Sequence, residues 1–97
     1  MIIKSSELAE ANGRKDYGIG RFQEQIEHFV VRVTRPENPF GPHGHEAAEF
    51  WFILEGEAIV TLDGQESPVA PGDLVVLAPW SMHGLRSETA VRWACFG

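Results

Sequence analysis

The side chains best suited to chemistry lie in residues 42–56, which read PHGHEAAEFWFILEG. His43 and His45 are two residues apart and Glu49 follows four residues later, so an extended chain would project all three from one face. A helix would separate two histidines at this spacing. Two imidazoles and a carboxylate that converge make up most of a site for a divalent cation of intermediate hardness. The spacing therefore predicts a metal site, with Trp51 continuing the same face as core.

A third histidine, His83, follows a loop that contains Pro79 and begins a predicted strand, where a side chain can point into the mouth of a barrel. Three neutral imidazoles and one carboxylate suit Mn, Fe, Co, Ni or Zn and leave coordination positions open for a ligand. His28 alternates with apolar residues, so we leave it out of the metal site, with substrate contact as its alternative role. Histidines beside proline and glycine are often plain surface residues, which leaves a metal-free structural barrel as the alternative for the whole cluster.

Short apolar strands are predicted throughout the second half of the chain. Turn signals separate them, with Asp63-Gly64 typical of a two-residue hairpin and Pro71-Gly72 of a type II turn. Residues 36–42 contain three prolines and a glycine, which are expected to break the chain before the histidines. This pattern, without a long helix, predicts an all-β sandwich or barrel. The expected strands cover residues 26–34, 49–55, 57–62, 65–69, 74–78, 83–87 and 90–96.

The chain length of 97 residues predicts one domain, with residues 1–25 as an N-terminal arm and residues 26–97 as the barrel. Within the arm, Ile2 and Ile3 could start a strand, and residues 6–11 have helical composition. Eight basic against 14 acidic residues argue against nucleic acid as a partner. No apolar run resembles a signal peptide or a membrane span. A single cysteine, Cys95, is expected to be a buried small hydrophobe and favours a cytoplasmic location.

Two stretches together resemble the motifs of the cupin family. Residues 42–56 resemble the first motif, and residues 72–87, GDLVVLAPWSMHGLRS, resemble the second, whose histidine corresponds to His83. The resemblance covers most of the chain from about residue 30. It implies a small double-stranded β-helix, or jelly-roll barrel, frequent dimerisation, and one metal ion held by His43, His45, Glu49 and His83. Glu37 and Trp80 stand where the family pattern has glycine, and Trp80 would narrow the pocket.

We expect a metalloenzyme that acts on a small anionic molecule, a hydroxy- or oxo-carboxylate or a sugar-derived acid, chelated at the ion. The alternative is a non-catalytic module that binds such a molecule for sensing or sequestration. The candidate substrate contacts are Trp51, Trp80 and Arg92. Phe50 and Phe52 would lie on the outward face of their strand, and this apolar face favours a homodimer.

Overall fold

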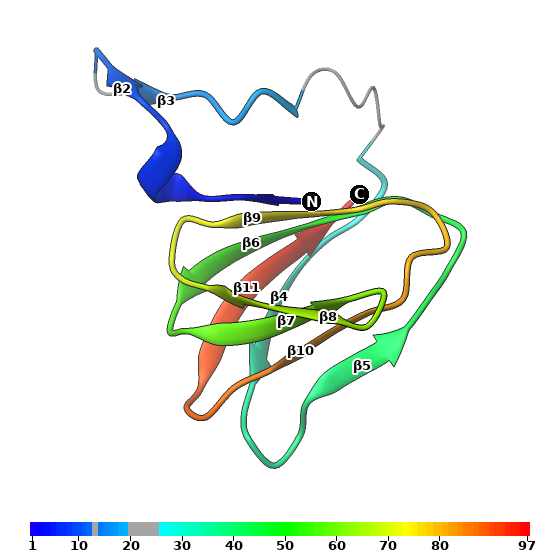
Figure 1. Cartoon of the computed structure of the whole chain (residues 1–97). Helices are drawn as coiled ribbons and strands as arrows, with labels where there is room; N and C mark the ends of the chain where they lie inside the picture. The colour runs from blue at the N-terminus through cyan, green and yellow to red at the C-terminus, as the bar shows by residue number, and fades with distance from the viewer. Residues whose placement is uncertain (13, 20–25) are drawn as a thin grey trace.

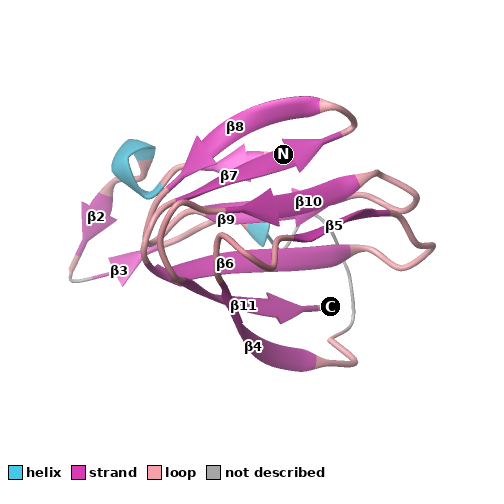
Figure 2. Ribbon diagram, turned by 90° about the horizontal axis from the view of Figure 1, so that it is seen from below, coloured by secondary structure: helices cyan, strands magenta, loops and turns pink. Residues whose placement is uncertain are grey.

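The computed structural model describes residues 1–12, 14–19 and 26–97, and these form two antiparallel sheets that pack face to face (Figures 1 and 2). The five-stranded sheet has the order β1-β9-β6-β11-β4, and the four-stranded sheet has the order β5-β10-β7-β8. None of the described residues forms an α-helix, which confirms the all-β prediction. The strands of the five-stranded sheet are β1 (Ile2–Ile3), β9 (Leu74–Leu77), β6 (Glu49–Glu55), β11 (Val91–Phe96) and β4 (Phe29–Thr34). Those of the four-stranded sheet are β5 (Phe40–His43), β10 (His83–Arg86), β7 (Ala58–Leu62) and β8 (Gln65–Val69).

The two predicted tight turns are present. Asp63 and Gly64 have φ values of 48° and 84°, the left-handed conformation that a two-residue hairpin between β7 and β8 requires. At the next turn Gly72 has a φ of 89°, and the Asp73 amide donates to the Ala70 carbonyl. Local turn chemistry therefore fixes the register of β7 with β8 and starts β9.

The core lies between the sheets and is built largely from alternate residues that point inward along the strands β6 to β11. Trp51 and Trp93 are fully buried, with ring centroids 4.7 Å apart. The indole N–H of Trp93 donates to the Thr34 hydroxyl at 3.0 Å, so its polar group is satisfied. The remaining core members are Ile53, Ala58, Val60, Val69, Val75, Leu77, Leu85, Val91 and Cys95.

The prediction that residues 36–42 only interrupt the chain was wrong at its end, because β5 begins at Phe40 and pairs with β10. Proline is tolerated because β5 is an edge strand. Gly41 has a φ of 71°, and a Cβ atom there would lie 2.6 Å from the carbonyl oxygen of His83. Glycine is thus what allows β5 to approach β10 so closely.

The N-terminal segment partly joins the barrel. The predicted strand at Ile2 and Ile3 is present and pairs with β9, but Ser5–Glu7 forms a single 3₁₀ turn where a longer helix was considered. The short hairpin of β2 (Glu10–Ala11) and β3 (Arg14–Lys15) projects from the sandwich (Figures 1 and 2). Residues 13 and 20–25, which include the expected end of the arm, lie outside the described residues.

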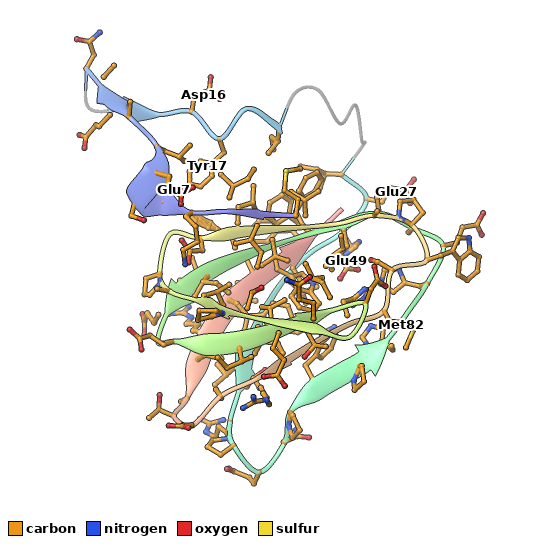
Figure 3. The ribbon with its side chains drawn as sticks, viewed as in Figure 1. Glu7, Asp16, Tyr17, Glu27, Glu49 and Met82 are labelled. Atoms are coloured by element: carbon orange, nitrogen blue, oxygen red, sulfur yellow. The ribbon has the colours of Figure 1, made fainter. Side chains whose placement is uncertain are left out.

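Tyr17 returns from this hairpin to the outer face of the five-stranded sheet (Figure 3). Its ring lies 5.6 Å from that of Phe52, and its hydroxyl donates to the Gly72 carbonyl at 2.5 Å. Part of the outward apolar face is therefore covered by the chain itself. Among the described residues, no helix has the length and apolar character needed to cross a bilayer.

Candidate metal centre

His43 and His83 are cross-strand neighbours at the antiparallel pairing of β5 with β10. Directly opposed residues point to the same face of a sheet, and here that face is the interior. Their ring centroids are 4.6 Å apart, with the planes nearly perpendicular. The close approach of the two strands at Gly41 therefore sets the position of both imidazoles.

His45 lies in the loop between β5 and β6, and two contacts hold it. Its backbone carbonyl accepts a hydrogen bond from the Trp80 amide at 2.7 Å. Its ring Nδ1 lies 2.8 Å from the Ala47 carbonyl, and because a carbonyl can only accept, Nδ1 carries the proton. The lone pair of a neutral His45 is therefore on Nε2.

The three histidines form one compact group. His45 and His83 have ring centroids 4.8 Å apart, and His43 and His45 are 5.6 Å apart. One ring nitrogen from each of the three lies within 4.8 Å of the others. Such spacing suits three ligands of one ion.

His83 is buried, with 1% of its surface exposed, and neither ring nitrogen makes a hydrogen bond of normal geometry. Burial lowers the pKa of His83, and the neighbouring His43 and His45 lower it further, while Glu49 and the Ser81 carbonyl act weakly in the opposite direction. The ring is thus kept neutral, the form that binds a metal. A buried imidazole with two unsatisfied nitrogens is costly unless something else binds it.

Glu49 opens β6 and lies in the interior (Figure 3). Its Oε1 accepts hydrogen bonds from the Trp51 indole at 2.8 Å and from the Cys95 thiol at 3.0 Å. Burial acts to raise the pKa of Glu49, but these two hydrogen bonds and the adjacent His45 and His28 outweigh it, so the pKa lies below its usual value. The carboxylate is therefore ionised.

The second oxygen of this carboxylate, Oε2, lies 3.3 Å from Nε2 of His45. In the tautomer of His45 described above, both atoms present lone pairs to each other, which is unfavourable unless a proton or a cation lies between them. This observation, together with the unsatisfied nitrogens of His83, shows that the donor set fits a divalent transition metal.

The expectation that one extended stretch of chain projects His43, His45 and Glu49 from the same face was wrong. His43 ends β5 in the four-stranded sheet, whereas Glu49 begins β6 in the five-stranded sheet. The histidines and the carboxylate meet because the two sheets face each other, and the intervening loop is folded back against residues 80–82. A Cβ atom on Gly44 would lie 3.0 Å from the Met82 sulfur, so this fold needs glycine or a shift of that side chain.

Two residues near Glu49 were not assigned to this region from the sequence. His28 Nε2 lies 3.6 Å from Oε2 of Glu49 and 3.7 Å from the Cys95 sulfur. Cys95 is buried as expected, but it also donates to the carboxylate. The available signal was strand alternation, since Cys95 shares the parity of Trp93 and His28 that of Thr34.

The three candidate substrate contacts lie in different surroundings. Trp51 is fully buried, and its N–H is engaged by Glu49. Trp80 lies on the loop beside His45 with 69% of its surface exposed and a φ of 64°. Arg92 points away from the core, 3.6 Å from Glu55, so the structure does not bring it to the histidines.

A hollow of about 420 Å³ lies at the other end of the β7–β10 pair, near Ala58 and Arg86. His83 pairs with Leu62 at the opposite end of the same two strands. This hollow is therefore separate from the histidine group, and the proposed metal site is supported by the donor atoms alone.

Comparison with known proteins places these features in context. Residues 29–97 match the sequence model of the Cupin domain family. The chain is similar to the structure of a predicted oxalate decarboxylase from Thermotoga maritima, with 21% identity and a TM-score of 0.68, covering 81% of this chain and 71% of that one. No curated protein matches the sequence.

Two further solved structures are similar over 70% of this chain, each with a TM-score of 0.66. One is a protein from Photorhabdus luminescens with 23% identity, and this chain spans 58% of its length. The other is salicylate 1,2-dioxygenase from Pseudoaminobacter salicylatoxidans with 19% identity, of which this chain spans 20%. At these identities the likeness shows a shared fold.

Proposed function

Because the chain belongs to the cupin domain family, we propose that its barrel holds one divalent transition metal ion, Mn, Fe, Co, Ni or Zn. The observation that carries this proposal is the buried ring of His83, whose two nitrogens lack partners and which faces two other imidazoles. When bound, the ion would supply Lewis acidity toward the oxygen atoms of a chelating ligand. The four proposed ligands are His43, His45, Glu49 and His83.

The charge of this donor set favours an anionic ligand. Glu49 contributes one negative charge and the histidines none, so a divalent ion would keep a net positive charge. We infer that the protein acts as an enzyme on a small hydroxy- or oxo-carboxylate or a sugar-derived acid. The names of two similar structures, a predicted oxalate decarboxylase and a salicylate dioxygenase with bound gentisate, concern small carboxylic acids and support this class.

The chain's own residues would orient the Glu49 carboxylate and provide a contact surface for such a molecule. Trp51 and Cys95 hold one oxygen of Glu49, so only Oε2 is available toward the histidines. Trp80, exposed on the loop beside His45, offers an aromatic surface at the rim. Trp80 is therefore the best placed of the three candidate substrate contacts.

Metal content tests the site. Protein prepared without a histidine tag and dialysed against Mn²⁺ should retain the ion, and Glu49→Gln or His45→Ala should lose it. Glu66→Gln is the matched control, because Glu66 is an exposed carboxylate paired with Arg86 on the outer face. Equal Mn²⁺ content in the wild type and in His45→Ala would refute the site and favour a metal-free barrel.

Turnover separates the two functional classes. The Mn²⁺-loaded and Fe²⁺-loaded protein would be incubated with a panel of small hydroxy-carboxylates, oxo-carboxylates and sugar acids, with and without oxygen. Conversion that is lost in His45→Ala supports an enzyme. Tight binding of a panel member without conversion would instead support the sensing or sequestration module.

We also propose a homodimer. The outward side chains of the edge strand β4 are apolar and exposed, with Phe29 at 65%, Val31 at 46% and Val33 at 49%. Phe29 continues a row of stacked rings with Phe96 and Phe50, at centroid distances of 5.6 and 5.4 Å. A second copy would cover this surface. A monomer at all concentrations in sedimentation equilibrium would contradict this proposal.

A cytoplasmic location is proposed on the chemistry of Cys95. The thiol is buried and free, and one cysteine cannot form an internal disulfide. Fractionation of cells that express the protein, with markers for each compartment, would test this location.

A further inference from the structure

We propose that His28, Glu49 and Cys95 form a second cation site, next to the three histidines, that binds a thiophilic divalent ion such as Zn²⁺ or Cd²⁺. One donor atom from each of these residues lies within 4.8 Å of the others. Neither His28 nor Cys95 is among the four proposed ligands of the histidine site, and the hydrogen bond from Cys95 to Glu49 leaves the position of His28 unexplained.

The distances between the donor atoms fit one small ion. His28 Nε2 lies 3.6 Å from Glu49 Oε2 and 3.7 Å from Cys95 Sγ, and Sγ lies 3.0 Å from Glu49 Oε1. Tetrahedral zinc bonds of about 2.0–2.3 Å place neighbouring donors roughly 3.3–3.6 Å apart. The two separations from His28 are within about 0.3 Å of that range. The 3.0 Å separation involves the other carboxylate oxygen, which accepts the hydrogen bond of the thiol.

Adjacent strands position the three side chains. Cys95 on β11 is paired with Trp51 of β6 on one side and with Val30 of β4 on the other. His28 directly precedes β4, and its backbone forms a reciprocal pair of hydrogen bonds with Gly97, at 2.8 and 3.1 Å. The site is therefore built on the sheet itself, which holds donor atoms more rigidly than a loop does.

Access and charge suit a cation. The His28 side chain is 40% exposed, whereas Glu49 and Cys95 are buried, so an ion would enter past the imidazole. When the S–metal bond forms, the thiol releases its proton to solvent. While the histidine site is empty, carboxylate and thiolate together supply two negative charges against the two positive charges of the ion, and the positive charge of Arg32 near the thiol opposes them in part.

The cost of this site is the removal of the thiol proton. Burial, followed by the hydrogen bond and the negative charge of Glu49, raises the pKa of Cys95 to about 12 although Arg32 acts in the opposite direction. A divalent cation at bonding distance would lower the pKa of Cys95 again, since a thiol that coordinates a metal is deprotonated. Thiophilic ions are thus favoured over Mn²⁺, which prefers oxygen ligands.

The two sites would share Glu49, whose Oε2 lies 3.6 Å from Nε2 of His28 and 3.3 Å from Nε2 of His45. Its Oε1 faces Cys95 and Trp51. A carboxylate in this position can bridge two ions. His28 and Cys95 nevertheless supply donor atoms only to the second site, and His43 only to the first, so variants can separate them.

Cadmium absorption tests the second site. Cd²⁺ would be titrated into the full chain while the ultraviolet thiolate-to-cadmium charge-transfer band is recorded. We expect the band in the wild type and in His43→Ala, and its loss in Cys95→Ala. In His28→Gln the Cd²⁺ affinity should fall at least about tenfold, and because the His28 side chain is 40% exposed we expect this variant to fold.

Two results would overturn the second site. One is the absence of the band in a wild type that still retains Mn²⁺. The other is a band whose Cd²⁺ affinity is unchanged in His28→Gln, which would mean that the thiol binds Cd²⁺ alone. Failure of the histidine site has a different signature, namely a normal Cd²⁺ band with no Mn²⁺ retained.

Discussion

The buried imidazole of His83 predicts that a bound metal ion reverses which protein is the more stable, the wild type or the variant His83→Leu. In metal-free protein its two ring nitrogens are buried without hydrogen-bond partners. The surroundings of the ring are partly apolar, with the Trp51 ring 5.3 Å away and Leu62 opposite on β7. Leucine, which is close to histidine in volume, should therefore be accepted at this position, and His83→Leu should stabilise the metal-free chain.

The expected magnitudes follow from burial and from binding. An unsatisfied buried polar group costs about 1–3 kcal/mol, so the leucine variant should gain an unfolding free energy of that order without metal. An ion at about 1,000 times its Kd stabilises the native state by about 4 kcal/mol. The wild type should receive this gain and the variant should not, so the wild type becomes the more stable protein in metal.

Urea unfolding in EDTA and in saturating Mn²⁺ would measure both effects. His43→Leu is the matched control, because His43 is only partly buried and should gain less in EDTA while losing the same Mn²⁺ effect. A His83→Leu protein that is less stable than the wild type in EDTA would show that the ring is satisfied in the metal-free state. Equal Mn²⁺ stabilisation of wild type and variant would show that His83 is not a ligand.

Three further substitutions have defined outcomes. Trp80 has a φ of 64°, so Trp80→Gly should be more stable than Trp80→Ala by about 1 kcal/mol in urea unfolding, and the usual order of alanine above glycine would refute this. Burial acts to raise the pKa of Asp73, but hydrogen bonds from Lys4 and two backbone amides outweigh it and hold the pKa below its ordinary value of 3.8. Its stabilisation is therefore present above pH 3.8 and lost as the pH falls through the lowered pKa. Asp73→Asn should cost about 2 kcal/mol at pH 7 and much less in acid, and a pH-independent difference would contradict this. Trp51→Phe removes the indole donor to Glu49, so Mn²⁺ affinity by titration should fall about tenfold, and unchanged affinity would show that this hydrogen bond does not orient the ligand.

Much of the fold follows from local rules. Apolar stretches and the turn signals between them located the strands β6 to β11, and the Asp63-Gly64 and Pro71-Gly72 turns were identified because their backbone conformations demand those residue types. The start of β4 was expected three residues too early, and β5 was missed. Proline has a low strand propensity, so Pro42 argues against a strand. Local propensity contains no information on whether a strand lies at the edge of a sheet, where proline is tolerated.

The candidate site was also only partly predictable from the sequence. Spacing suggested a metal site at His43, His45 and Glu49, and the resemblance to two cupin motifs gave the full set with His83. The sequence could not show that His43 and Glu49 come from facing sheets, nor that Arg92 points outward to Glu55.

The convergence of His28, Cys95 and Glu49 was decided only by tertiary structure. Cys95 and Glu49 are 46 residues apart in sequence, and no local pattern joins them. They meet because β11 pairs with β4 on one side and β6 on the other, and pairing between distant strands depends on the whole sheet. A period of two residues shows which side chains share a face, but only the packed sheets determine which face turns inward and which side chains meet there.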